Sequence, residues 1–265
     1  MAASPDTVSM AMFCDFENVA LGVRDANYEK FDIKPVLERL LLKGSIVLKK
    51  AYCDWDRYKG FKAGMHEANF ELIEIPHVRQ SGKNSADIRL VVDALDLCYT
   101  KAHIDSFVIL SGDSDFSPLV SKLRENAKTV IGVGVKSSTS DLFLNNCDEF
   151  IYYDDLVREA PARKKVVRKA VREAKSTASP QGPSLEGALE QLVETIDALA
   201  AERAEDDLIW GSMVKQALKR RNPGFNERAH GFKSFNDLLQ AAQSRGLLIL
   251  EPDQRSGGYT VRVAE

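Results

Sequence analysis

Apolar runs of strand length alternate with longer amphipathic segments along the first 156 residues of the chain. Each run is almost continuous in hydrophobic residues, which is typical of parallel strands covered on both faces. We expect six strands, at residues 9–14, Ser45–Tyr52, Phe70–Ile75, Ser106–Leu110, Thr129–Val133 and Glu149–Tyr152. Helices are expected between them, near 33–43, 56–69, 85–101, 115–127 and 140–146. This alternation predicts an α/β fold with a doubly wound parallel sheet.

The pattern changes after the proline-rich stretch that ends at Pro183. Apolar residues at helical spacing predict helices at Ser184–Glu205, Leu208–Arg220 and about Ser234–Arg245. Two short strands are expected after them, at Leu247–Leu250 and Gly258–Val263. Three helices followed by a hairpin are typical of a winged helix-turn-helix, a scaffold that binds nucleic acid or protein.

A basic segment separates these two parts of the chain. Residues 157–175 contain eight basic and two acidic side chains, a net charge of +6, whereas the remainder carries −9. Such a run is as typical of a solvated linker helix as of a contact to RNA phosphates. We therefore expect domains at 9–156 and 184–265, joined by a basic linker at 157–183.

Composition limits the class of protein. The 265 residues suffice for one large or two modest domains, and a net charge of −3 argues against a nonspecific nucleic-acid binder. No apolar run approaches the roughly 20 residues of a membrane span, and the N-terminus lacks the features of a secretory signal. The four cysteines are widely spaced, which favours buried reduced thiols. A cytoplasmic protein with no membrane association is expected.

Two of the predicted strands end in acidic residues. The run at 106–110 is followed by Ser111-Gly112, then by Asp113 and Asp115, and the strand at 9–14 is followed by Asp15. The carboxyl ends of strands in an open α/β sheet are where ligands bind. We therefore expect these carboxylates to gather at one edge of the sheet.

Asp87, in the first turn of the predicted helix 85–101, is a further candidate. Taken singly, Asp115 or its neighbour Ser114 is explained as a helix cap, and Asp87 as a charge favoured at a helix N-terminus. Four carboxylates at one edge would however repel one another unless a cation lay among them. The sequence thus predicts a divalent-metal site, with the oxygen ligands that Mg²⁺ takes. Its ligands would be Asp15, Asp87, Asp113 and Asp115.

Several other chemistries lack their motifs. His77 stands where a P-loop would need its first glycine before Gly82-Lys83, and the four histidines form no H-E-x-x-H. No G-x-S-x-G motif occurs. The sequence Asp15-Phe16-Glu17 is reminiscent of the D-x-D motif of aspartyl-phosphate phosphatases, but it has Glu in the second position and lacks the following Thr.

Three ordered motifs resemble the NYN domain, a branch of the PIN-like ribonucleases. They are Asp15-x-x-Asn18, Lys83-x-x-x-Asp87 and Ser111-Gly112-Asp113-Ser114-Asp115-Phe116, and the resemblance spans residues 9–155. The second part of the chain is similar to the OST-HTH (LOTUS) domain. That similarity rests on Trp210-Gly211-Ser212, Pro223-Gly224-Phe225, Gly231-Phe232 and Phe235.

The resemblance implies a PIN-like sheet followed by a winged helix-turn-helix, and cleavage of RNA with Mg²⁺ or Mn²⁺. It implies that Asp15, Asp87 and Asp113 form the core metal-binding set, with Asp115 as an additional ligand or a holder of water. Ser111 and Asn18 would support these ligands, Asn18 by orienting a carboxylate or by binding through water.

Basic residues in both parts are candidate contacts to RNA. Arg79, Lys83 and Lys136 are candidates in the first part. In the second part, Lys215, Lys219 and Arg221 lie toward one side and the end of a predicted helix, where they would equally complement the helix C-terminus.

Three functions remain open from the sequence alone. The intact set of acids favours a metal-dependent ribonuclease whose C-terminal module binds RNA. The alternative is a non-catalytic RNA-binding or regulatory scaffold, in which the acids bind a structural ion or nothing. The C-terminal domain could instead bind a protein partner, and a homo-oligomer is left open.

Overall fold

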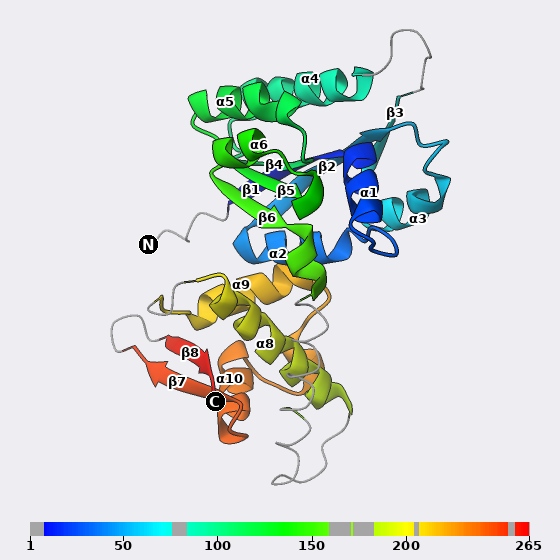
Figure 1. Ribbon diagram of the computed structural model, residues 1–265. Coiled ribbons are helices and arrows are strands. Elements are labelled where there is room, and N and C mark those ends of the chain that lie inside the picture. The colour runs from blue at the N-terminus through cyan, green and yellow to red at the C-terminus, as the bar shows by residue number, and fades with distance from the viewer. Residues whose placement is uncertain are drawn as a thin grey trace. The chain divides into compact units, whose positions relative to one another are not determined.

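The computed structural model of the protein is shown in Figure 1. It describes residues 8–75, 84–158, 171, 183–203, 207–253 and 258–264. The chain divides into two compact units, with the boundary after Val157. No helix in these described ranges is long and apolar enough to cross a membrane.

The first unit is built on a six-stranded, fully parallel sheet. Its strands are β1 (Ser9–Asp15), β2 (Ser45–Cys53), β3 (Glu71–Glu74), β4 (Ser106–Leu110), β5 (Thr129–Gly134) and β6 (Glu149–Tyr152). All six predicted strands are present, and their ends differ from the predicted ones by at most one residue. The strand order is β3-β2-β1-β4-β5-β6, so the direction of winding reverses between β1 and β4. That reversal is the switch point at which such sheets bind ligands.

Helices cover both faces of the sheet (Figure 1). They are α1 (Phe16–Asp25), α2 (Lys34–Lys43), α3 (Lys59–Glu67), α4 (Ser85–Thr100), α5 (Ser117–Glu125) and α6 (Asp141–Asn146), with short 3₁₀ turns η1 (Ser114–Phe116) and η2 (Lys136–Ser138). Five of the helices match predicted ones, although α3 and α5 are shorter than predicted. Helix α1 was not predicted, because it follows β1 without an intervening loop.

The side chains of β1 alternate between two hydrophobic cores. Met10, Met12 and Cys14 belong to one core, which also contains Trp55 from the β2–α3 connection. Ala11 and Phe13 belong to the other, on the side of α4 and α5. Each large side chain buried in this way contributes roughly 1.5–3 kcal/mol to folding, so β1 is the central support of the unit.

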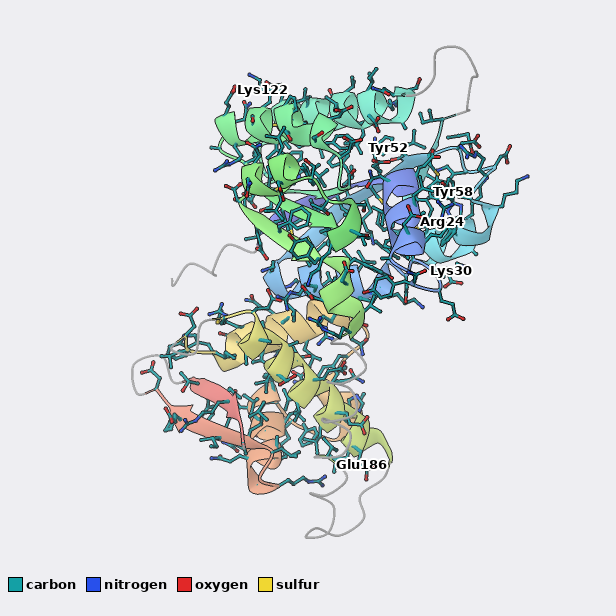
Figure 2. All side chains as sticks on the ribbon, viewed as in Figure 1. Arg24, Lys30, Tyr52, Tyr58, Lys122 and Glu186 are labelled. Atoms are coloured by element: carbon teal, nitrogen blue, oxygen red, sulfur yellow. The ribbon has the colours of Figure 1, made fainter. Side chains whose placement is uncertain are left out.

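A polar contact ties α4 to the sheet. Tyr52 on β2, labelled in Figure 2, donates from its hydroxyl to Asp93 over 2.9 Å. Lys50 and Arg89 donate to the same carboxylate, each over 3.0 Å. Burial alone would raise the pKa of Asp93, but these hydrogen bonds and the nearby positive charges hold it below its usual value. Asp93 is therefore a structural acid with its hydrogen bonds satisfied.

From residue 183 onward, the described part of the second unit contains three helices and a hairpin. Its elements are α8 (Pro183–Ala201), α9 (Gly211–Arg221), the 3₁₀ turn η4 (Glu227–His230), α10 (Phe235–Ser244), β7 (Leu248–Pro252) and β8 (Tyr259–Val263). β7 and β8 pair in antiparallel fashion, and Trp210 forms a single bridge to Thr260 beside them. The predicted elements are thus present. Most of the predicted basic linker, 157–183, lies outside the described residues.

Candidate active site

Asp15 occupies the junction of β1 and α1. One oxygen, Oδ1, accepts a hydrogen bond from the backbone N–H of Asn18 over 3.4 Å, which caps the helix. The other, Oδ2, accepts one from the Ser111 hydroxyl over 2.9 Å. Since β1 and β4 are hydrogen-bonded neighbours, the residues that follow them meet at the switch point. The fold therefore brings Asp15 beside the Ser-Gly-Asp segment, and only 6% of Asp15 remains exposed.

Gly112 anchors the loop after β4. Its N–H donates to the Asn18 side-chain oxygen over 2.9 Å, and its carbonyl accepts from the Ser140 N–H over 2.8 Å. A Cβ atom at this position would overlap the backbone oxygen of Ser138, so only glycine fits without displacement. Asn18 thus supports the site by holding this loop.

Asp113 and Asp115 follow in a short 3₁₀ turn. Asp113 caps η1, because its Oδ1 accepts a hydrogen bond from the Asp115 N–H over 2.9 Å. The prediction that Ser114 or Asp115 caps the helix was therefore wrong: α5 starts only at Ser117 and has no side-chain cap. Asp113 is partly buried, whereas Asp115 is exposed.

Asp87, in the first turn of α4, completes a set that we call the acidic site: Asp15, Asp87, Asp113 and Asp115. Burial raises the pKa of Asp87 to about 6, and the charges of Asp113, Asp115 and Glu17 add to the shift. Burial likewise raises the pKa of Asp15 to about 7, with a contribution from Asp87, although the hydrogen bond from Ser111 opposes it.

The acidic site has no compensating positive charge among the described residues. None of its four carboxylates forms an ion pair there with Lys or Arg, whereas the neighbouring Glu17 pairs with Arg57 at 3.2 Å. The charges of the neighbouring acids therefore disfavour the charged forms of Asp15 and Asp87, which a cation would reverse.

A metal ion fits the donor set, but not as a closed cage. Within the described ranges, no three His, Cys, Asp or Glu side chains are arranged to hold an ion among them. The carboxylate oxygens are nevertheless the hard ligands that Mg²⁺ and Mn²⁺ prefer. Mg²⁺ is commonly held by one or two carboxylates and completes its shell with water and substrate phosphate, so an open acidic site is compatible with it.

Of the predicted RNA contacts of the first unit, Lys136 lies within the described residues. Arg79 and Lys83 lie outside the described residues. Lys136 pairs with Asp155 at 2.8 Å and lies 5.2 Å from the centre of the Tyr152 ring. Its charge is thus used within the fold.

The predicted contacts of the second unit differ from one another in their surroundings. Lys215 pairs with Glu227 at 3.1 Å. Arg221 contacts Glu194 at 3.8 Å and donates to the Thr195 hydroxyl, and only 14% of its side chain is exposed. These contacts link α9 to α8. Lys219 is exposed and forms no ion pair with a described residue, so it is the best placed of the three to meet a ligand.

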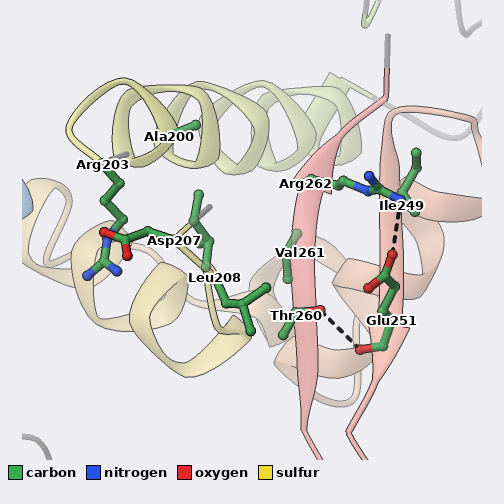
Figure 3. Close-up of a pocket in the computed structure, with 10 residues that line it drawn as sticks. Ala200, Arg203, Asp207, Leu208, Ile249, Glu251, Thr260, Val261 and Arg262 are labelled. Atoms are coloured by element: carbon green, nitrogen blue, oxygen red, sulfur yellow. Dashed lines mark hydrogen bonds and ion pairs between the residues drawn. The ribbon is translucent and has the colours of Figure 1, made fainter. Parts of the chain in front are cut away.

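Two grooves were not predicted from the sequence. One, of about 740 Å³, lies beside Asp87 and Asp115. Helix α4 is apolar on two faces, and periodicity alone did not show that Ile88 and Val92 are exposed. The other, of about 360 Å³, lies in the second unit between the end of α8 and the hairpin, where Arg262 pairs with Glu251 at 3.0 Å (Figure 3).

The parallel sheet, its switch point and the acids beside it define an α/β domain of the PIN-like type. Residues 9–154 match the model of the NYN domain, and the chain belongs to the NYN domain family. This match confirms the resemblance of the first unit to the NYN domain. Because NYN domains are typically nucleases, it also supports a hydrolase. The match ends before the second unit.

A solved structure shares this architecture. The crystal structure of a protein of unknown function from Vibrio parahaemolyticus is 26% identical in sequence, with a TM-score of 0.51. The similarity covers 58% of this chain and 97% of that one. No curated protein matches the chain.

Proposed function

We propose that the protein is a metal-dependent ribonuclease that hydrolyses phosphodiester bonds at the acidic site. One observation carries the proposal: the fold gathers four carboxylates from three segments of the chain, with no cationic partner in the described structure. Burial and the charges of neighbouring acids raise the pKa of Asp15 and of Asp87. Charged groups are rarely held in this way for stability alone, and perturbed carboxylates in a ligand-binding position are typical of functional sites. Membership of a family of nucleases makes a nucleic acid the expected substrate.

Each residue has a role in this proposal. Asp15, Asp87 and Asp113 would hold Mg²⁺ or Mn²⁺, with Asp115 as a further ligand or a holder of water. Such an ion, when bound, lowers the pKa of water and neutralises charge on phosphate. Ser111 orients the Asp15 carboxylate through its 2.9 Å hydrogen bond. Asn18 fixes the Gly112 loop, and with it the position of Asp113.

For the second unit we propose a winged helix-turn-helix of the OST-HTH (LOTUS) type that retains RNA. Three helices, an antiparallel hairpin and the Trp210–Thr260 bridge support this architecture. The exposed Lys219 near the end of α9 supports a contact to phosphate. A protein partner is the second candidate, because Leu208 and Ile249 are exposed apolar side chains beside the groove of Figure 3.

The first experiment is cleavage of end-labelled single-stranded RNA by the full chain, with Mg²⁺, with Mn²⁺ and with EDTA. We expect metal-dependent cleavage that Asp113→Asn lowers on the order of 100-fold, because the amide keeps the shape but loses the charge that holds a cation. Asp96→Asn is the matched control, since Asp96 is an exposed acid on α4. Cleavage that survives EDTA, or that both variants affect equally, would reject the site.

A further inference from the structure

The groove beside the acidic site, which we call the α4 groove, lies between α4, the start of α5 and α6. Asp87 and Asp115 are among the residues that line it. Its apolar surface is contributed by Ile88 and Val92, one helical turn apart on α4, and by Leu142 on α6. These three side chains are 62%, 55% and 58% exposed, values that are unusual for large aliphatic residues unless a ligand covers them.

One hydroxyl group of the α4 groove lining has no hydrogen-bond partner in the described structure. Ser117 is only 6% exposed, and its hydroxyl has no hydrogen-bond partner in the described structure. Asn84 precedes α4, but its side chain does not cap the helix. A buried hydroxyl without a partner costs free energy, so its presence in a groove points to a ligand that completes it.

The charge of the lining indicates which part of a substrate it would take. None of the described residues that line the α4 groove is Lys or Arg. Phosphate binding relies on such cations, so this surface does not suit a phosphate. Apolar walls combined with hydroxyl and amide groups instead match a nucleobase, which has apolar faces and polar edges. The volume of about 740 Å³ lies in the range of pockets for small organic molecules, roughly 300–1,000 Å³.

We propose that the α4 groove binds an unpaired nucleoside adjacent to the phosphate that is cleaved. This inference rests on the proposed ribonuclease function and adds that the substrate is single-stranded, since a paired base could not present its face and edges to the groove. The α4 groove is continuous with Asp87 and Asp115, which line it. This continuity favours RNA, rather than a second copy of the chain, as the occupant of the groove. The cores of protein interfaces are depleted in such charged residues, and burying them without a partner is costly.

The test compares side-chain removal inside and outside the α4 groove in the full chain. The groove variant is Ile88→Ala/Val92→Ala, and Leu142→Ala repeats the test from a different helix. Tyr99→Ala is the matched control, because Tyr99 is equally exposed on α4 but does not line the groove. We expect the double variant to raise the KM for a short single-stranded RNA roughly tenfold, because less apolar surface is covered when the base binds. The control should leave KM unchanged.

An RNA that lacks one base next to the mapped cleavage position supplies a second readout. In the wild-type protein this abasic RNA should show about the same rise in KM as the double variant shows with intact RNA. The double variant acting on the abasic RNA should have a KM little higher than either change gives alone. The variant and the missing base remove the same interaction.

Each remaining outcome contradicts the inference in a distinguishable way. If the wild-type protein cleaves RNA and the groove variants behave like Tyr99→Ala, the ribonuclease stands and the α4 groove is not its base site. If sedimentation shows that the double variant converts a dimer to a monomer, the groove is a self-interface. If the wild-type protein cleaves no RNA with either metal, the proposed function fails and the inference fails with it.

Discussion

If Asp15 holds a cation as proposed, it is the residue at which the demands of folding and of metal binding conflict. It is nearly buried at the end of the central strand, and burial raises its pKa to about 7. A cation can be held only by the charged form, whereas the metal-free fold favours the protonated one. The hydrogen bonds from Ser111 and from the Asn18 N–H partly offset this conflict by stabilising the charge. The residue therefore links stability, pH and metal binding.

The stability of the metal-free protein should depend on the ionisation of Asp15. Its pKa rises from 3.8 to about 7 on folding, so the folded state binds the proton more tightly. The resulting stabilisation is complete below the unfolded value of 3.8 and is lost as the pH rises through about 7. Asp15→Asn should therefore flatten the fall in stability between pH 5 and pH 8 by at most about 3 kcal/mol, as measured by urea unfolding in EDTA. A variant that keeps the wild-type pH dependence would contradict this.

Ser111 is a positioning residue whose removal should alter a pH profile. Its hydroxyl lowers the pKa of Asp15, so Ser111→Ala should raise that pKa further. The acidic limb of the profile of kcat/KM should then move to higher pH by about one unit, with activity near that of the wild type well above the transition. A uniform loss at every pH would instead indicate that the loop had moved.

At the scale of elements, the site depends on the tight passage of the β4–η1 loop between α1 and η2. Gly112 makes this passage possible, and its hydrogen bonds connect Asn18 on α1 to Ser140, the N-cap of α6. The loop is therefore a structural part of the site, and it also carries Asp113, one of the proposed metal ligands.

Gly112→Ala should lower the free energy of unfolding by roughly 1–3 kcal/mol, because the added methyl group forces the Ser138 backbone to move. It should also lower RNA cleavage by displacing Asp113. Gly64→Ala in α3 is the matched control, since nothing lies within 4 Å of a Cβ atom there. Replacing a helical glycine in open space should raise stability by about 0.5–1 kcal/mol. Chemical denaturation of the Gly112→Ala and Gly64→Ala variants measures both free energies of unfolding. Equal free energies of unfolding in the two variants would refute the packing argument at Gly112.

The sequence was most informative where burial is uniform. Strands covered on both faces appear as apolar runs, and so β1 and β4 could be located to within a residue. Helix α1 was missed because Asp15 both ends β1 and caps the helix, leaving no turn residues between the two patterns. The true cap of η1, Asp113, was missed because periodicity does not distinguish a 3₁₀ turn from the first turn of an α-helix.

How far the candidate site could be anticipated depended on the order of the elements along the chain. Asp15, Asp113 and Asp115 were chosen as candidates because they follow strands that the topology makes neighbours. The bond from Gly112 to Asn18 joins residues 94 positions apart, and the exposure of Ile88 depends on how α4 packs. Such features belong to tertiary structure, and no local pattern contains them.

At the scale of the molecule, the proposal divides labour between the two units. All four acids lie before Val157, and the first unit has its own two hydrophobic cores. A chain that ends at Val157 should therefore fold and still cleave single-stranded RNA. It should bind RNA more weakly, and the slope of log K against log salt should become shallower by about 0.7 for every phosphate that the shorter chain no longer neutralises. Anisotropy titrations of both chains at several salt concentrations provide the measurement; identical slopes would exclude a role in binding for the rest of the chain.

The pairing of β1 with β4 has a consequence for the order of events during synthesis. Ser111 and Asp15 are hydrogen-bonded across 96 positions of sequence, and the intervening segment supplies Asp87. A nascent chain emerging from the ribosome carries Asp15 long before its partners exist. Because non-local strands can pair only after the connecting chain has been made, the carboxylates stay dispersed until the fourth strand is released. Most of the first unit must therefore be translated before the acidic site can form.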